Sequence, residues 1–527
     1  MKSVSVFRIM AFLLIISSVY ISPAQARPLL PDDFDKFVEQ VRKEFDVPGI
    51  AVSVVFDGKV VLAKGYGVKK VNEPAPVDAH TLFNIASNTK AFTATALAML
   101  EEEGKIDWDD PVIKYIPEFR LSDPYVTNEI NIRDLLVHRS GLGLGAGDLL
   151  WWPESDFERR EIVRRLQYIP LSTSFRNSYA YDNVLYLVAG ELIERVTGIS
   201  WEEFVKNRIL NKLGMSESRI NQSETKLAPQ FATPHARIDG VVREVKTLTK
   251  SNVNPAAGIN SSATDMAKWL TVQLDSGRVA DNSQLFSPKT AKTLWTLVTP
   301  RNISDPPAEL APLRRDFSGY GLGFGITDYR GRKLVSHTGS WPGFVSRVAM
   351  IPEMKLGIAV LTNQESECAY NAIIHHILDH YLRAPKFDWI QAYKTNLASE
   401  ISRTNATLEN ARANRDATSQ PFLPLASYAG TYTDMWYGDV VIKMENGKLV
   451  IYFTHTPSLV GNLEHWQYNT FVARWKDPEI RADAYITFDL NHDGSIDQAK
   501  MIAVSPATDF SFDFHDLLLK PAPVADH

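Results

Sequence analysis

The stretch Phe83-Asn84-Ile85-Ala86-Ser87-Asn88-Thr89-Lys90-Ala91-Phe92 places a serine and a lysine three residues apart, directly before an apolar run. Residues 91–103 have the apolar spacing of a helix, and Gly104 is suited to end it. Side chains at i and i+3 share one face of a helix, so we expect the Ser87 hydroxyl to meet the Lys90 ammonium. Near a helix N-terminus, free N–H groups and the helix dipole would favour negative charge on Ser87.

The same Ser-x-x-Lys spacing recurs at Ser223-Glu224-Thr225-Lys226, inside the polar segment 221–226. No helical pattern follows this second match. We interpret it as a surface coincidence, so the spacing alone does not identify a site and the rest of the chain has to decide.

Predicted strands lie at both ends of the first 380 residues. Residues 50–56 and 59–63 flank Asp57-Gly58, a two-residue hairpin signal. Helical spacing dominates from 156 to 274, and strands return near 320, at 322–326, 333–336, 346–351 and 357–362. Shorter helical patterns occupy 33–45, 132–138 and 370–382. This order predicts an α/β (α+β) domain whose terminal strands share one sheet around an inserted helical lobe.

A second, smaller domain is predicted at the C-terminal end. Residues 384–424 are polar and helix-prone, and we interpret them as a connector. Short strands separated by turns follow within 425–522, at 428–432, 440–443, 449–453, 471–475 and 484–489. This pattern suits a small antiparallel barrel or sandwich.

The N-terminus has the pattern of a secretory signal peptide over residues 1–26. Two basic residues precede an apolar stretch from 9 to 21, and Ala24-Gln25-Ala26 forms a small-residue cleavage site. The apolar stretch is too short to span a bilayer. Cleavage would change the formal charge from −6 to −8, with 54 basic against 62 acidic residues. We therefore expect a periplasmic or secreted protein with no nucleic-acid partner and no stable membrane span.

Two further motifs follow the serine in chain order. Tyr181-Asp182-Asn183 precedes the helical pattern 184–196, and His337-Thr338-Gly339 follows the predicted strand 333–336. Ser-x-x-Lys, Tyr-x-Asn and His-Thr-Gly in this order resemble the serine β-lactamase and penicillin-binding-protein superfamily. The resemblance is to its class C β-lactamase and D-alanyl-D-alanine carboxypeptidase B branch.

The resemblance spans roughly residues 34–382 of the predicted hydrolase domain, residues 27–383, and implies an antiparallel sheet with an inserted helical lobe. Residues 425–432 resemble the start of the lipocalin-like module appended to some peptidases and esterases of this group. We therefore expect a lipocalin-like β-barrel over residues 425–522.

The resemblance assigns roles to the motif residues. Ser87 is the expected nucleophile, and a serine hydroxyl needs a base to remove its proton. Lys90 can serve once burial lowers its pKa, while the family gives Tyr181 a share in proton transfer, so either residue remains a candidate base. Asn183 would bind the acyl side of the substrate or hold Lys90. The remaining expected substrate-binding residues are Thr338, Gly339 and Ser340, the last supplying an oxyanion-hole N–H together with Ser87.

His337 departs from the lysine that many β-lactamases and transpeptidases carry at this position. A histidine is largely neutral at pH 7 and can form a hydrogen bond near Tyr181. We count His337 with Ser87, Lys90 and Tyr181 among the expected catalytic residues. We therefore expect a D-stereospecific aminopeptidase, peptidase or esterase, acting on a small-molecule or short-peptide substrate. The alternatives are a β-lactamase or D-Ala-D-Ala carboxypeptidase and, in another class, a catalytically silent penicillin-binding sensor.

Other signals do not carry a site. His138 could pair with the serine, but its position at the end of a predicted helix favours a capping role. The glycine-rich run 319–325 leads into a strand and is no nucleotide fingerprint. The segment beginning at Asp489 resembles a calcium loop but has Lys500 where a glutamate is required, so a hairpin turn is expected there. No metal and no cofactor are inferred.

Overall fold

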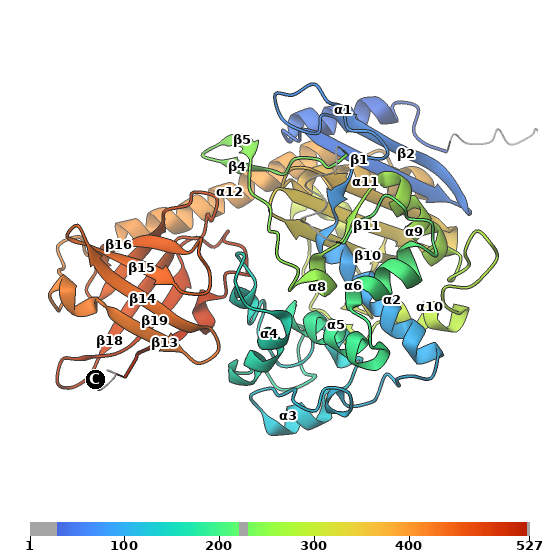
Figure 1. Ribbon diagram of the computed structural model, residues 1–527. Helices are drawn as coiled ribbons and strands as arrows, with labels where there is room; N and C mark the ends of the chain where they lie inside the picture. The colour runs from blue at the N-terminus through green and yellow to red at the C-terminus, as the bar shows by residue number, and fades with distance from the viewer. Residues whose placement is uncertain (1–28, 221–229, 524–527) are drawn as a thin grey trace, which may run out of the picture.

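The computed structural model describes residues 29–220 and 230–523. The predicted signal peptide, residues 1–26, and the second Ser-x-x-Lys match at Ser223 lie outside this described part. The chain forms a mixed helix-and-sheet body and a closed barrel, and helix α12 (Trp389–Ala413) runs between them (Figure 1).

An eight-stranded antiparallel sheet forms the centre of the first body. Its first two strands come from the N-terminal end and the other six follow residue 298, which confirms that both ends of this domain share one sheet. In sheet order the strands are β2 (Lys59–Gly67), β1 (Gly49–Phe56), β12 (Leu356–Thr362), β11 (Phe344–Ile351), β10 (Arg332–Trp341), β9 (Gly325–Tyr329), β8 (Ser318–Tyr320) and β7 (Thr299–Pro300).

Helices cover both faces of this sheet. One core contains α1 (Phe34–Glu44) and α11 (Glu367–Leu382), and the other contains α2 (Thr89–Glu102) and α9 (Ala263–Leu274). Successive residues of a strand point to opposite faces, so a strand between two cores is mostly apolar, and in β1 the buried Ser53 is the polar exception. In β1 the residues facing the first core are Ile50, Val52 and Val54, and those facing the second are Ala51 and Val55.

The inserted lobe packs against α2 on the second face of the sheet (Figure 1). Its helices are α3 (Pro124–Glu129), α4 (Arg159–Arg165), α5 (Val184–Thr197), α6 (Trp201–Val205), α8 (Asn254–Ala257) and α10 (Pro288–Leu294). The helix predicted over 132–138 is only a 3-10 turn, Asp134–Leu136. His138 adopts a φ of 56°, a left-handed conformation that a helix cannot continue through.

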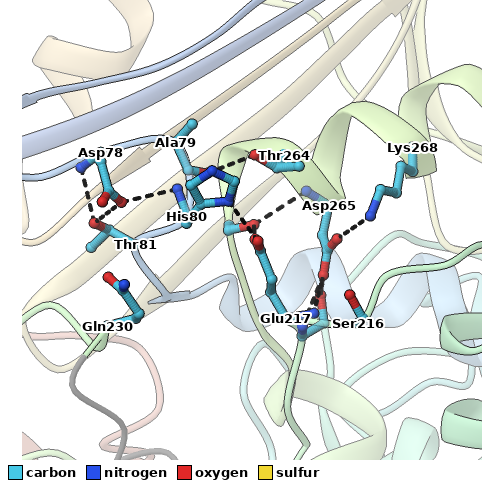
Figure 2. A network of polar contacts seen from close by, with 12 residues as sticks. Asp78, Ala79, His80, Thr81, Ser216, Glu217, Gln230, Thr264, Asp265 and Lys268 are labelled. Atoms are coloured by element: carbon cyan, nitrogen blue, oxygen red, sulfur yellow. Dashed lines mark hydrogen bonds and ion pairs between the residues drawn. The ribbon is translucent and has the colours of Figure 1, made fainter.

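A polar network fastens the lobe beside the strand that leads to Ser87 (Figure 2). The Asp265 carboxylate accepts the backbone N–H groups of Glu217 and Ser218 at 2.9 and 2.8 Å, and Lys268 at 2.9 Å. Thr264 donates to the Ala79 carbonyl at 3.1 Å. These bonds connect three separate segments, so the N-terminus of α9 stays fixed against the entry to β3 (Phe83–Asn84).

The C-terminal body is a closed eight-stranded antiparallel barrel, which decides between the barrel and the sandwich that the sequence left open. Closure comes from β13 pairing with β20, where Tyr432 opposes Pro521. In order the strands are β13 (Gly430–Asp434), β14 (Gly438–Glu445), β15 (Lys448–Phe453), β16 (Val460–Gln467), β17 (Thr470–Trp475), β18 (Ala484–Leu490), β19 (Ile496–Ala503) and β20 (Leu518–Pro521). The expected turn after Asp489 is the β18–β19 hairpin.

Helix α12 fills most of the stretch interpreted as a connector. Its first two turns are buried against the hydrolase body through Trp389, Ile390, Ala392, Tyr393 and Asn396. The rest of the helix is largely exposed. Among the described residues no helix combines the length and hydropathy needed to cross a membrane.

Candidate active site

Ser87 lies in a short, strained turn between β3 and α2. The turn is a 3-10 segment, Ala86–Asn88, in which Ala86 has a φ of 46°. A non-glycine residue in the left-handed region costs conformational energy and needs local support. The Asn84 side chain provides support by accepting the Ala86 backbone N–H at 2.7 Å. This turn presents Ser87 to an open cavity while its neighbours remain buried.

Lys90 is fully buried one turn further along. Its Nζ donates to Ser87 Oγ at 3.1 Å, Asn183 Oδ1 at 2.7 Å and the Ala256 carbonyl at 3.2 Å. Burial lowers the Lys90 pKa to about 7, although Asp148 and Asp182 oppose the decrease. A sizeable neutral fraction at physiological pH therefore allows this amine to accept a proton from Ser87.

Tyr181 stands beside this pair. Its ring centroid is 4.9 Å from Lys90 Nζ. The hydroxyl is buried and has no hydrogen bond of acceptable geometry to any described residue. Burial raises the Tyr181 pKa well above its ordinary value, and the neighbouring Ser87 hydroxyl lowers it only in part. At neutral pH Tyr181 is thus a protonated phenol facing the nucleophile.

Asn183 holds Lys90, which is one of the two roles expected for it, and it also lines the cavity. Its Oδ1 accepts Lys90, and its Nδ2 donates to Asp148 Oδ2 at 2.8 Å. Asp148 also accepts Trp151 Nε1 at 2.9 Å. Burial raises the Asp148 pKa to about 7, while its three side-chain donors and Lys90 oppose that increase. Asp148 lies outside every sequence motif, and no spacing signal pointed to it.

His337 lies on β10 and forms its side-chain hydrogen bond with Tyr320. Its Nε2 is 2.7 Å from the Tyr320 hydroxyl, and its Nδ1 is 2.5 Å from the Thr338 carbonyl. A carbonyl only accepts, so Nδ1 carries the proton and Nε2 accepts from Tyr320. Burial, reinforced by Lys90, lowers the His337 pKa to about 3. The imidazole is neutral, as expected, but Tyr181 is only a ring neighbour at 6.2 Å.

The three residues after His337 divide between the two faces of β10. Thr338 and Ser340 are exposed and line the same cavity as Ser87. Gly339 points the other way, toward the Ser87 turn. A Cβ at Gly339 would lie 2.2 Å from the Ile85 carbonyl oxygen and 3.0 Å from Ala86 Cβ. The glycine is therefore what lets β10 run directly alongside the nucleophile.

His138 is buried and does not reach Ser87 through any hydrogen bond among the described residues. Its Nδ1 accepts the Asp182 backbone N–H at 3.1 Å, and its carbonyl accepts the Ala180 N–H at 3.0 Å. Its ring centroid is 4.3 Å from that of Tyr181. His138 thus anchors the segment that carries Tyr181, and its left-handed backbone ends the preceding turn.

The predicted site residues converge on one cavity of about 430 Å³. Ser87, Tyr181, Asn183, His337, Thr338 and Ser340 line it, while Lys90 and Gly339 lie directly behind the wall. Three arginines that the sequence did not single out line the same cavity, Arg301, Arg315 and Arg347. Residue 337 is not a cation, but these three arginines place positive charge elsewhere in the cavity wall. Of these three arginines, Arg347 alone lies opposite a motif residue. It pairs with Thr338 across strands β10 and β11, so a predicted β10–β11 hairpin would have pointed to it.

Residues from the barrel also reach this cavity. Asp509, Phe510 and Ser511 lie in its wall, and all three belong to the segment joining β19 to β20. The Phe510 ring meets Tyr181 edge-on with centroids 5.9 Å apart. No sequence motif marked this segment, since its partners are more than 300 residues away along the chain.

Solved structures share the fold of this chain. A penicillin-binding protein homologue from Pyrococcus abyssi, described as octameric, aligns with 93% of this chain and 99% of its own at 22% identity and a TM-score of 0.58. A class C β-lactamase from Rhodobacter sphaeroides aligns with 67% of this chain and all of its own, at 20% identity and a TM-score of 0.53. Both likenesses concern the fold, and they confirm the expected β-lactamase-like architecture.

Curated relatives extend the likeness to sequence. An unguisins hydrolase of Aspergillus violaceofuscus is 30% identical over 459 residues, which cover 80% of this chain and 78% of the relative. The protein Flp of Staphylococcus aureus is 26% identical over 349 residues, covering 65% of this chain and 64% of Flp.

Two family models match the chain. Residues 414–521 match a domain of unknown function, DUF3471, which corresponds to the barrel. Residues 34–381 match the β-lactamase model, and this segment contains Ser87, Lys90, Tyr181 and His337. The chain therefore belongs to the β-lactamase family.

Proposed function

We propose that this protein is a serine hydrolase that cleaves amide or ester bonds through an acyl-enzyme on Ser87. The observation that carries the proposal is the Lys90 amine, fully buried, 3.1 Å from Ser87 Oγ and with a pKa lowered to about 7. A buried ammonium without a carboxylate in direct contact has a strong tendency to lose its proton. The hydrolase name of a relative 30% identical supports the same conclusion.

The acylation step uses the groups in contact with Ser87. Neutral Lys90 takes the Ser87 proton as Oγ attacks the carbonyl carbon, and the carbonyl oxygen becomes an oxyanion. The backbone N–H groups of Ser87 and Ser340 are the proposed donors to that oxygen. When the tetrahedral intermediate collapses, the bond to the leaving group breaks, and the protonated amine returns its proton to the leaving nitrogen or oxygen through the Tyr181 hydroxyl.

Deacylation repeats these steps with water as the nucleophile. Water gives its proton to the Lys90 and Tyr181 pair, attacks the acyl carbon and releases the acid, and Ser87 recovers its proton. Asn183 keeps the lysine in place throughout, because its Oδ1 accepts from Nζ at 2.7 Å.

We propose a D-stereospecific peptidase or esterase as the finer activity. A neutral His337 gives no fixed charge beside the scissile bond, so uncharged acyl groups should bind there without penalty. The second candidate is a β-lactamase or D-Ala-D-Ala carboxypeptidase. It is favoured by Arg301, Arg315 and Arg347, because guanidinium groups bind carboxylates well. The signal-peptide pattern supports the proposal that either enzyme works in the periplasm or outside the cell.

Covalent labelling tests the nucleophile. A fluorophosphonate added to the full chain should increase the intact mass by one label in wild type and in Ser223→Ala, and by none in Ser87→Ala. The Ser223 variant is a matched control because it carries the same spacing. Equal labelling of the wild type and Ser87→Ala would defeat the assignment, and labelling without any turnover would favour a silent sensor.

Substrate comparison separates the two candidates. We expect kcat/KM for p-nitrophenyl acetate and D-alanine p-nitroanilide to exceed that for nitrocefin. Nitrocefin hydrolysis far above both would make the β-lactamase reading the correct one.

A further inference from the structure

One loop of the barrel packs into the inserted lobe. This β19–β20 loop, residues 504–517, joins two neighbouring strands of the barrel. Its Phe514 packs inside the barrel on Trp475, whereas Ser511 and Asp513 make hydrogen bonds to the lobe. Ser511 and Asp513 are 5% and 0% exposed, although they lie in a connecting segment. Loops normally run over the surface because their polar groups need water or partners. Here the partners come from the lobe, so the loop is part of the interface.

Asp513 fixes the backbone around Asp148. Its Oδ2 accepts the Gly147 N–H at 2.6 Å, and its Oδ1 accepts the Leu149 N–H at 3.0 Å. These two N–H groups flank Asp148 on both sides. The lobe's own segment therefore depends on a carboxylate of the barrel to satisfy buried donors, which are expensive to leave without a partner.

Ser511 reaches Asp148 itself. Its hydroxyl donates to Asp148 Oδ2 at 2.8 Å, the same oxygen that accepts Asn183 Nδ2. With Nδ2 held by Asp148, the amide must turn its Oδ1 toward Lys90, where the distance to Nζ is 2.7 Å. The four residues form a continuous chain of buried hydrogen bonds from the barrel to the amine beside Ser87.

We propose that Ser511 is a positioning residue for Lys90, acting through Asp148 and Asn183, so that the barrel is a working part of the active site. This inference rests on the proposed serine hydrolase function. The hydroxyl keeps Asp148 in the orientation in which it holds the Asn183 amide. Without it, Oδ2 loses one of its two donors, and the carboxylate and the amide gain other rotamers.

The test uses Ser511→Ala in the full chain with p-nitrophenyl acetate as substrate. We expect kcat to fall roughly ten- to hundredfold, the effect of losing one hydrogen bond to a charged group. KM should stay within about threefold, because the hydroxyl that the substitution removes donates to Asp148, although Ser511 lines the cavity. Ser511→Thr keeps the hydroxyl and should retain most of the wild-type kcat.

Asp434→Asn is the matched control for damage to the barrel. Asp434 is a buried barrel carboxylate that accepts the N–H groups of Trp436, Tyr437 and Leu518, each at 2.8 Å. The turn it holds meets the inserted lobe at Arg165, which donates to the Trp436 carbonyl at 2.9 Å, and among the described residues Asp434 has no hydrogen bond to Asp148, Asn183 or Lys90. We expect this variant to lower the melting temperature at least as much as Ser511→Ala while its kcat stays near wild type.

The outcomes separate this inference from the function on which it rests. Unchanged kcat in Ser511→Ala would overturn the positioning role alone. So would an equal loss in Ser511→Ala and Ser511→Thr, because the hydroxyl would not be the cause, or an equal loss in Asp434→Asn. Failure of the wild type to show any Ser87-dependent turnover would overturn the hydrolase proposal and this inference with it.

Discussion

Replacing Gly339 with alanine should disable the site by moving one strand. The added Cβ would lie 2.2 Å from the Ile85 carbonyl oxygen, whereas carbon and oxygen in contact stay about 3.3 Å apart. The strand and the Ser87 turn must therefore separate by about 1 Å. That carbonyl also accepts Ser346 Oγ at 2.8 Å and the Asn88 N–H at 3.1 Å, so it cannot rotate away freely.

A displacement of this size between a nucleophile and its oxyanion donors costs roughly 10²-fold in rate. The overpacking itself should destabilise the fold by about 1–3 kcal/mol. The assay is kcat/KM for p-nitrophenyl acetate, with the melting temperature measured on the same samples. Gly430→Ala is the control, since it adds the same methyl to a strand glycine whose nearest neighbour is 3.8 Å away. Gly339→Ala activity within threefold of wild type would refute the reasoning.

Three further predictions concern the proton-transfer residues and an arginine of the cavity. Lys90→Ala and Tyr181→Phe should each lower kcat by about 10²–10⁴-fold, and losses below tenfold in both would require a different base. The Lys90 pKa is lowered to about 7, so the amine gains its proton as the pH falls through this value. We therefore expect kcat/KM to drop on the acid side with a midpoint near 7. A flat profile from pH 5 to 8 would contradict this. Arg347→Gln should lower kcat/KM for nitrocefin roughly tenfold more than for uncharged p-nitrophenyl acetate, and equal effects would mean that Arg347 does not meet the carboxylate.

The sequence predicts those parts of the structure that depend on residues close together in the chain. The Ser87 and Lys90 contact follows from i, i+3 spacing on one helix, and the structure places the two atoms 3.1 Å apart. The two-residue turn at Asp57-Gly58 follows from positive φ values of 46° and 72°, which this pair tolerates. Both depend on neighbours along the chain, so their residue types carry the information.

The parts that sequence missed depend on distant pairing. Asp148 meets Ser511 across 363 positions, and neither residue stands in a periodic pattern or a motif. The arginines enter the cavity from three segments that only the folded sheet brings together. His337 was recognised as neutral, but its partner Tyr320 lies on β8, two strands away from β10. The residue type indicates the chemistry of these positions, but their hydrogen-bond partners are determined by the topology of the folded chain.

The proton affinity of Lys90 belongs to a group of residues rather than to the lysine alone. Burial raises the pKa of Asp148 and of Asp182 to about 7, the value to which it lowers that of Lys90. The charges of Asp148 and Asp182 raise the Lys90 pKa against the effect of burial, so the midpoint of the pH profile depends on these carboxylates as well as on the lysine.

Within this cluster the Ser511 hydroxyl favours the charged form of Asp148, and a charged Asp148 favours the protonated form of Lys90. The contact from the barrel thus raises the Lys90 pKa, whereas burial lowers it. A base must release its proton to the leaving group as well as accept one from Ser87, and an amine with a much lower pKa would be a weaker acceptor. The contact from the barrel therefore helps keep Lys90 close to the working pH, where both halves of the reaction can proceed.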